Sequence, residues 1–466
     1  MLQAFSVRIK KAIWEEIDDS KFCIIVDEAR DKSRKEQMAI VLRFVDKDGF
    51  IRERFFGLVH VSDTKASTLQ KVIYSVLSNH NLDIQNIRGQ GYDGASNMRG
   101  EWNGLQALIL KDCPYAYYVH CLAHRLQLAL VAASREVIPI QNFFTKLTFI
   151  VNILGASCKR NDEFQSAQAE EIAYLTSIDE LETGRGLNQI GTLQRAGDTR
   201  WSSHFRSISS LRQRFSPTCQ VLLNIIEEGK SPQAGDADSA YESMTSYQFV
   251  FILHLMEEIM ENTNELCLAL QSQSQGILNA MSLVSSTKAF IQKLRDDGWD
   301  TLFAKVDIFY AAIDSQLQEL NNRFNEHAVE LLTLSSALDP TKISKCFKID
   351  AIYHEKLQLK KQLEFFEYDV VKDQEFKSIS TISDLSQWLV RTKRSTRYPL
   401  VYRVIVLVLT LPVSTATTER SFSAMRIVKT RLCNRMENDF LTDSLLMYIE
   451  KEIAEKFTID SIIDDF

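Results

Sequence analysis

The first third of the chain switches between two periods of hydrophobic spacing. Apolar residues three and four positions apart predict amphipathic helices over residues 1–20 and 67–77. Compact apolar runs predict strands at residues 22–26, 38–45, 51–61, 115–119 and in a segment that ends at Asp93. Residues 46–49, Asp-Lys-Asp-Gly, have turn chemistry and join two strands as an antiparallel hairpin. Three strands followed by alternating helices and strands predict a mixed sheet with helices on its faces.

Strand signals largely disappear after about residue 137. Helical spacing then covers residues 138–154, 205–228, 247–270, 277–294 and 302–324, with loop-like segments at 178–198 and 231–238. An apolar run at 398–411 and a cluster of small residues follow near the end. We therefore expect an α/β part followed by a long helical block.

Composition and charge narrow the class of protein. The chain has 466 residues, 45% hydrophobic and 25% charged, which is ordinary for a soluble globular protein of two or three domains. Its eight cysteines form no C-x-x-C pair, so we expect reduced thiols and no disulfide framework. No signal peptide and no apolar stretch of roughly 20 residues is present, so we expect an intracellular protein without a membrane partner. The net charge of -7 argues mildly against nucleic acid, although a local basic groove can exist on an acidic chain.

Two carboxylates stand directly after predicted strands. Asp27 ends the first strand, and Asp93 lies in a turn between Gly91 and Gly94. Glycine permits positive φ and lets the backbone approach a substrate or ion closely. If the two strands are neighbours, both acids lie at the same edge of the sheet. The alternative for Asp93 is that it only fixes an Asx-turn.

A third carboxylate, Glu419, follows the small residues 414–418. Helical offsets place Glu419, Ser423 and Arg426 on one face. Further cations follow at Lys429, Arg431 and Arg435. Such a charge run is either a solvated face or a contact for phosphates.

Six segments together resemble the hAT superfamily of DNA transposases, in particular the group associated with TTF-type and MYM-type zinc fingers. They are VDEARD (26–31), RGQGYDGASNM (88–98), VHCLAHRLQLAL (119–130), DTRWSSH (198–204), ALDP (337–340) and YPLVYRVIVLVLTLPVSTATTERSFSAMRIVKTRLCNRM (398–436). The last segment is the most specific, because it resembles the hAT C-terminal dimerisation region over its full length.

The resemblance implies an α/β fold with a large all-α insertion, in which an RNase H-like mixed sheet is interrupted by a helical domain. Residues 1–135 would form the first part of the core, 136–395 the helical insertion, and 396–466 the completion of the core and the dimerisation region. By motif, Asp27, Asp93 and Glu419 match the catalytic acids, which would hold a divalent metal, Mg²⁺ or Mn²⁺. The physical logic agrees, since phosphoryl transfer with two divalent ions needs a few carboxylates at one edge of a rigid sheet. The carboxylates' alternative role is in turns and caps.

Other matched residues would contact DNA. Trp201 matches a tryptophan that stacks on a flipped base, and its alternative is an ordinary core position. Arg200 stands beside it, and Arg426 and Lys429 would contact phosphates.

Two features depart from a simple reading of the motifs. Cys121 and His124 match a C-x-x-H motif, but no further ligand stands at a suitable spacing, so a packed helix start is favoured over a zinc site. No zinc-finger pattern precedes Asp27, so we expect a chain without the N-terminal end-recognition module.

Two classes of function remain. The first is a nuclear transposase that cuts and joins DNA strands as a homodimer or higher homo-oligomer. The second is a domesticated, catalytically inactive nuclear protein that acts through dimerisation and through DNA or protein binding. Terminal inverted repeats and target-site duplications around the gene would favour the first class.

Overall fold

The chain forms two compact units in the computed structural model. The first unit comprises residues 1–125, 269–283 and 326–466, and the second comprises 126–268 and 284–325. The structure describes residues 2–181, 184, 188–197, 201–229, 233–296, 306–324, 355–370, 373–430 and 435–458.

A five-stranded sheet in the order β3-β2-β1-β4-β5 lies at the centre of the first unit. Its strands are β1 (Phe22–Arg30), β2 (Glu36–Val45), β3 (Ile51–His60), β4 (Ile87–Tyr92) and β5 (Tyr117–His120). The first three pair antiparallel, whereas β4 pairs parallel with β1 and β5 parallel with β4. The mixed sheet predicted from the apolar runs is therefore confirmed.

Helices from both ends of the chain pack on this sheet. The early helices are α1 (Leu2–Ile17), α2 (Ala66–Asn79), α3 (Ser96–Arg99) and α4 (Leu105–Asp112). The late ones are α18 (Pro399–Thr410), α19 (Ala416–Val428), α20 (Asn438–Ile449) and α21 (Lys451–Ala454). Ile9 and Ile13 of α1 and Ile73 of α2 are fully buried, and each such side chain stabilises the fold by about 1.5–3 kcal/mol. The predicted helices at 1–20 and 67–77 are confirmed.

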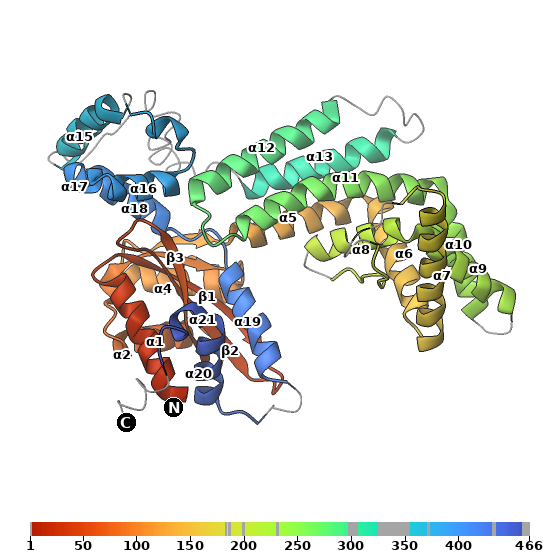
Figure 1. The fold of residues 1–466 in the computed structure, drawn as a ribbon, viewed down its shortest axis with the longest axis horizontal. Helices are drawn as coiled ribbons and strands as arrows, with labels where there is room; N and C mark the ends of the chain where they lie inside the picture. Colours follow the sequence, from red (N-terminus) through yellow and green to blue (C-terminus); the bar gives the residue numbers. More distant parts are fainter. Residues whose placement is uncertain are drawn as a thin grey trace. The chain divides into compact units, whose positions relative to one another are not determined.

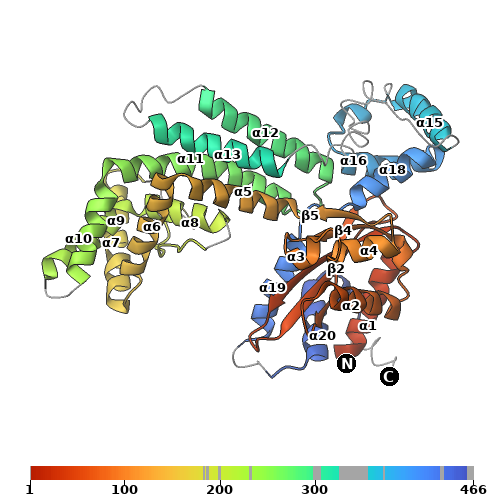
Figure 2. The same ribbon diagram turned by 180° about the vertical axis from the view of Figure 1, so that it is seen from behind.

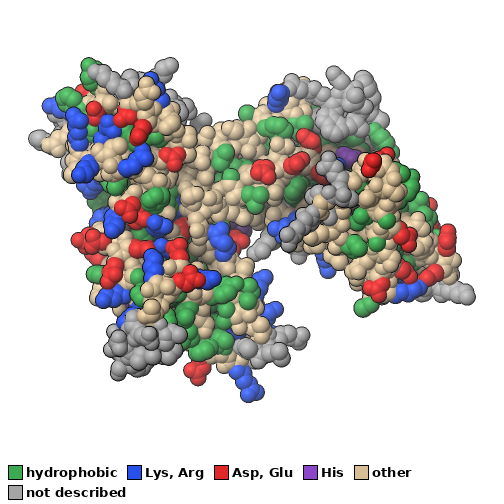
Figure 3. All heavy atoms as spheres, viewed as in Figure 1, with side chains coloured by type: hydrophobic (Ala, Val, Ile, Leu, Met, Phe, Trp, Pro, Cys, Tyr) green, Lys and Arg blue, Asp and Glu red, His purple; other side chains and the backbone are tan. Residues whose placement is uncertain are grey.

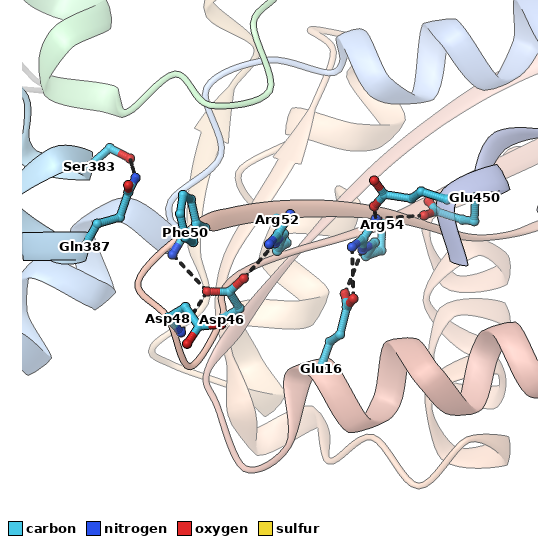
Figure 4. Close-up of polar contacts among 10 residues, drawn as sticks. Glu16, Asp46, Asp48, Phe50, Arg52, Arg54, Ser383, Gln387 and Glu450 are labelled. Atoms are coloured by element: carbon cyan, nitrogen blue, oxygen red, sulfur yellow. Dashed lines mark hydrogen bonds and ion pairs between the residues drawn. The ribbon is translucent and has the colours of Figure 1, made fainter. Parts of the chain in front are cut away.

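The two ends of the sequence lie side by side (Figure 1). Helix α20 contacts both α1 and β3, and the Thr442 hydroxyl donates to the Leu58 carbonyl at 2.6 Å. Arg54 of β3 adds ion pairs to Glu16 of α1 at 2.7 Å and to Glu450 at 3.2 Å, as Figure 4 shows. The C-terminal helices therefore complete the same core that the N-terminal strands begin.

The turn between β2 and β3 is closed by Asp46. Its carboxylate accepts hydrogen bonds from the amides of Asp48 and Phe50 at 3.0 and 2.9 Å and pairs with Arg52 (Figure 4). Gly49 has a φ of +86°, a conformation that favours glycine. The hairpin predicted at residues 46–49 is confirmed.

A smaller core joins α15 (Glu355–Val370), α16 (Ile382–Arg391) and α17 (Arg394–Arg397) to α18. Phe366, Trp388 and Val401 are buried in it, together with Val45 at the end of β2. Helices α15 and α16 lie within the stretch that we assigned to the insertion, yet their buried apolar residues share a core with those of α18. The bounds 1–135, 136–395 and 396–466 stay a prediction.

Helices make up the regular structure in the described part of the second unit. They are α5 (Leu122–Glu136), α6 (Ile138–Leu154), α7 (Cys158–Ser177), α8 (Trp201–Gln213), α9 (Phe215–Glu228), α10 (Gln233–Thr245), α11 (Tyr247–Leu270), α12 (Ile277–Asp296) and α13 (Val306–Arg323), of which α5, α11 and α12 extend into residues of the first. None of the described helices is by itself long and apolar enough to cross a membrane, and α5 and α6 meet the length and composition test only as a pair bent by 103°.

Two predictions in this unit were wrong. The expected loop at 231–238 is helical from Gln233, because Ala237, Ala240 and Met244 recur at helical spacing and are buried. The single helix expected at 205–228 is broken at Arg214, and Pro217 lies in the first turn of α9, where its missing N–H costs no hydrogen bond.

Candidate active site

Asp27 and Asp93 lie at the same edge of the sheet. Strands β1 and β4 are parallel neighbours, and their register pairs Ile25 with Gly91. Each aspartate stands two residues beyond this pair. The prediction that the strands leading to these acids are adjacent and parallel is therefore confirmed.

The glycines on either side of Asp93 serve close packing. A Cβ on Gly91 would lie 2.9 Å from the Cβ of Pro412, and a Cβ on Gly94 would lie 2.8 Å from the Nε2 of His120. Positive φ, the other role we considered, occurs among the described glycines at Gly49 and Gly229 and not here. The C-terminal segment therefore crosses β4 where glycine leaves room for it.

The loop that carries Asp93 is an Asx-turn as well as a strand end. The Asp93 carboxylate accepts a hydrogen bond from the Ala95 amide at 3.0 Å, and the Tyr118 hydroxyl donates to the Asp93 carbonyl at 3.3 Å. The helix expected from Asn97 onward is divided into α3 and α4. Both roles considered for Asp93 are thus compatible, since the turn holds the carboxylate at the sheet edge.

Glu419 lies in the first turn of α19 and comes within electrostatic reach of Asp27. This helix contacts β1, β2 and β3, and Figure 2 shows it beside β2. The Leu122 amide donates to the Val413 carbonyl at 2.9 Å, which ties the segment before α19 to the end of β5. Glu419 is near enough to Asp27 to raise the pKa of that carboxyl. The expected return of the third acid to the first is confirmed.

The site gathers carboxyl groups that are only partly exposed to water. Burial, and then the charges of Asp93 and Glu419, raise the pKa of Asp27 to about 8, although the Glu28 amide donates to its carboxylate. Burial likewise raises the pKa of Glu28 to about 7, although the Asn97 amide group donates to it at 3.4 Å. A cation placed among these groups would be strongly favoured.

Glu28 is the residue that motif reasoning left out. It follows Asp27 directly, and side chains alternate along a strand, so it faces the side of the sheet on which α3 supplies Asn97. Its Oε1 is buried, with no hydrogen-bond partner among the described residues. The adjacent Asp-Glu pair was the available signal.

The carboxylates of Asp27, Asp93 and Glu419 suit a divalent ion by their chemistry more than by their arrangement. Carboxylate oxygens are the ligands that Mg²⁺ and Mn²⁺ prefer. Within the residues that the structure describes, no three His, Cys, Asp or Glu side chains are already grouped as an ion site. Asp93 and Glu419 are therefore within electrostatic reach of Asp27, but the described residues are not arranged as a coordination site.

Cys121 lies at the start of α5, as expected for a packed helix start. Its Sγ accepts from the His124 amide at 3.3 Å and from the Thr415 amide at 3.3 Å. Burial raises the pKa of the thiol to about 11, so it stays protonated at neutral pH. Cys121 thus joins the end of β5 to the residues just before α19.

The residues expected to contact DNA lie in different settings in the structure. Arg426 is exposed on α19, two turns after Glu419. Lys429 is 1% exposed and pairs with Asp31 at 2.6 Å, so its assignment as a phosphate contact was wrong, because the charge is already used to join α19 to β1. Trp201 begins α8. Arg200 and the ALDP segment lie outside the described residues.

Comparisons with known proteins match both ends of the first unit. Residues 1–104 match a family described as "ZMYM1/FAM200, RNase-like domain", and residues 363–453 match the "hAT family C-terminal dimerisation region". Asp27 and Asp93 fall in the first match and Glu419 in the second.

Curated relatives are more distant. The chain is 24% identical over 302 residues to the mouse protein "52 kDa repressor of the inhibitor of the protein kinase", a match over 56% of this chain and 38% of the relative. The human protein of the same name is 26% identical over 131 residues, 28% of this chain and 17% of the relative. The chain therefore spans well under half of the relatives it matches. Because both family matches fall where the motifs predicted them and in the predicted order, the chain is hAT-related, with a ZMYM1/FAM200-type RNase-like domain at its start and a hAT C-terminal dimerisation region near its end.

Proposed function

We propose that this chain is a hAT-type transposase-like protein that cleaves and transfers DNA strands with a divalent metal, Mg²⁺ or Mn²⁺. The observation that carries the proposal is the convergence of Asp27, Asp93 and Glu419, from two strands and a helix far apart in sequence, on one edge of the sheet. The fold would then be an RNase H-like sheet interrupted by a helical domain.

The residues have distinct roles in this proposal. Asp27, Asp93 and Glu419 would hold the ions, which supply activation of water and stabilisation of the leaving oxygen. Asp27 carries a proton for part of the time at neutral pH, and binding of a cation displaces it. Arg426 lies on the Glu419 face and would steady the phosphates.

DNA would be held by local contacts more than by overall charge. Basic and acidic side chains are interspersed over the face seen in Figure 3, in keeping with a net charge of -7. Base stacking on Trp201 and a phosphate contact by Arg426 would therefore supply specific anchors. We assign the protein to the nucleus, where this substrate lies, and to a homodimer or higher oligomer formed through the C-terminal region.

The deciding experiment is relaxation of supercoiled plasmid with Mg²⁺ or Mn²⁺. Wild type should nick the plasmid with little sequence selectivity. Asp27→Asn, Asp93→Asn and Glu419→Gln should each lower the rate by at least about 100-fold, because each removes a ligand for the ions. Glu170→Gln, an exposed carboxylate on α7, is the matched control and should nick like wild type. If Asp93→Asn also nicks like wild type, the proposed chemistry is wrong.

A second candidate function is a domesticated, inactive protein that works through dimerisation and through DNA or protein binding. It is favoured by the relatives, which are named repressors, and by the described acids, which are not grouped as a finished ion site. Plasmid that stays supercoiled with wild type, together with a gene that lacks terminal inverted repeats, would make this the better account.

A further inference from the structure

Arg43 places a positive charge in the middle of the core of the first unit. It lies on β2, its side chain is fully buried, and it pairs with the equally buried Glu53 of β3 at 2.7 Å. Its guanidinium also donates to the carbonyls of Gln273, Gln275 and Leu409 at 3.0, 2.6 and 3.2 Å. A buried charge is costly unless it is paired and hydrogen-bonded, and here it is fully engaged.

Thr417 links the Arg43–Glu53 ion pair to α19, the helix that carries Glu419. The second carboxylate oxygen of Glu53 accepts a hydrogen bond from the Thr417 hydroxyl. That hydroxyl accepts in turn from Nη2 of Arg420 at 2.7 Å, and Arg420 Nη1 donates to the Gln271 carbonyl at 3.2 Å. In the sequence, Thr417 stands two positions before Glu419 and Arg420 stands directly after it. The first turn of α19 is therefore tied to β3 immediately beside the acid.

A second tie holds the same turn from the other side. Thr415 stands at the N-cap of α19 but makes no capping bond with its side chain. Instead its hydroxyl and amide both donate to the Sγ of Cys121, at 3.4 and 3.3 Å. The Thr415 carbonyl accepts the amide of Glu419 at 3.1 Å. Tertiary partners thus replace the local cap that usually begins a helix.

We propose that Arg43, acting through Glu53 and Thr417, is a positioning residue for Glu419. This role rests on the proposed function, in which Glu419 completes a set with Asp27 and Asp93. The first two acids stand on neighbouring strands, so the register of the sheet aligns them. Glu419 arrives on a helix that follows the insertion, so core packing and tertiary hydrogen bonds, and not sheet register, set its place. Misplacement by about 1 Å is enough to cost a site of this kind about 100-fold in rate.

A matched pair of substitutions tests the hydrogen bond between Thr417 and Glu53. Thr417→Val removes the hydroxyl that bonds Glu53. Thr418→Val removes a neighbouring buried hydroxyl that bonds only the Thr415 carbonyl of its own helix, at 2.6 Å. Thr417→Ser keeps the hydroxyl and is the rescue variant. All three should unfold at similar denaturant concentrations, since each changes a single small group.

The first measurement does not depend on activity. Hydrogen exchange of the peptide that covers residues 413–421 should be on the order of 10-fold faster in Thr417→Val than in Thr418→Val, because only the first substitution removes a bond that anchors this turn to β3. Thr417→Ser should exchange like wild type. Equal exchange in Thr417→Val and Thr418→Val would overturn the proposal, whether or not the protein cuts DNA.

The second measurement follows the consequence for the site. Residues that support metal ligands typically affect affinity or rate by 10–100-fold when replaced. Thr417→Val should weaken Mn²⁺ binding, measured by calorimetry, and should lower kcat for nicking by that range with the KM for plasmid unchanged. A wild type that binds Mn²⁺ without nicking would refute the proposed function alone, whereas a change in KM with kcat intact would refute the positioning role alone.

Discussion

Asp27 holds a carboxyl group where burial and two further carboxylates all disfavour its charge. Its pKa of about 8 lies well above the ordinary value near 3.9. The folded state therefore binds a proton more tightly than the unfolded state does. The stability that this proton contributes is fully present below about pH 4 and is lost as the pH rises to about 8.

Replacing Asp27 by Asn should make this dependence visible. At pH 4 the unfolding free energies of Asp27→Asn and wild type should be similar. At pH 8 the variant should be the more stable by about 3–5 kcal/mol, because about four pKa units at about 1.4 kcal/mol each set an upper limit that the partial exposure of the carboxyl group lowers. Denaturant unfolding in EDTA from pH 4 to 8 measures the difference, with Glu170→Gln as the control. Adding Mn²⁺ should stabilise wild type more than Asp27→Asn at pH 8. A difference that does not vary with pH would contradict the charge cluster.

Charge and hydrophobic patterns do not predict the burial of every single residue. Lys429 stands in a run of cations that helical spacing cannot divide into exposed and buried members. The ion pair with Asp31, almost 400 positions earlier in the sequence, makes Lys429 a buried member of the run. At Asp93 the glycines on either side indicated a close approach, which we expected to be that of a substrate or ion, whereas Pro412 and His120 pack against them.

At the level of elements, the crossing of β4 by the C-terminal segment delivers α19 to the site. Gly91 leaves the space in which Pro412 lies, and Gly57 on β3 is a strand glycine where an added Cβ would meet only Thr442 at 3.9 Å. The two glycines therefore form a matched pair.

Gly91→Ala should destabilise the protein by about 1–3 kcal/mol, the usual cost of overpacking a core. Gly57→Ala should be neutral or stabilising by up to about 1 kcal/mol, because it lowers the entropy of the unfolded chain. Thermal or urea unfolding compares them. Equal effects of the two substitutions would show that Pro412 does not rest on β4 in solution.

At the level of the whole molecule, the C-terminal region offers apolar side chains to a partner. Phe440 and Tyr448 of α20 are 54% and 53% exposed and fall within the hAT dimerisation match. Exposed aromatic residues of this kind are enriched at protein interfaces. We expect a second copy of the chain to cover them.

Light scattering at micromolar concentration should give the mass of a dimer or larger oligomer for wild type. Phe440→Glu should shift it toward the 53.4 kDa monomer, because a charge at an apolar contact is left without a partner. Tyr174→Glu, at a similarly exposed aromatic on α7 outside the match, should leave the mass unchanged. A monomeric wild type would remove the dimer from the proposal.

The sequence by itself determined the elements and their order. Hydrophobic spacing located the strands and most helices because a strand or an amphipathic helix must bury one face, and this requirement is local. The same reasoning failed at 231–238, where small residues supply the buried face of α10. It also placed Asp27 and Asp93 at strand ends. Strand β4 does end before Asp93, whereas β1 continues past Asp27 to Arg30 because these residues stay paired with β2. One topological assumption then sufficed to bring the two acids together.

Tertiary structure alone decided how the third acid is held. Nothing in the spacing of residues 414–420 indicates that Thr417 bonds Glu53, that Thr415 bonds Cys121, or that Pro412 rests on Gly91. These contacts join residues about 290 to 360 positions apart. Local periodicity carries no information about such pairs, because they form only when the chain has closed the loop that contains the helical unit and the core has excluded water around them.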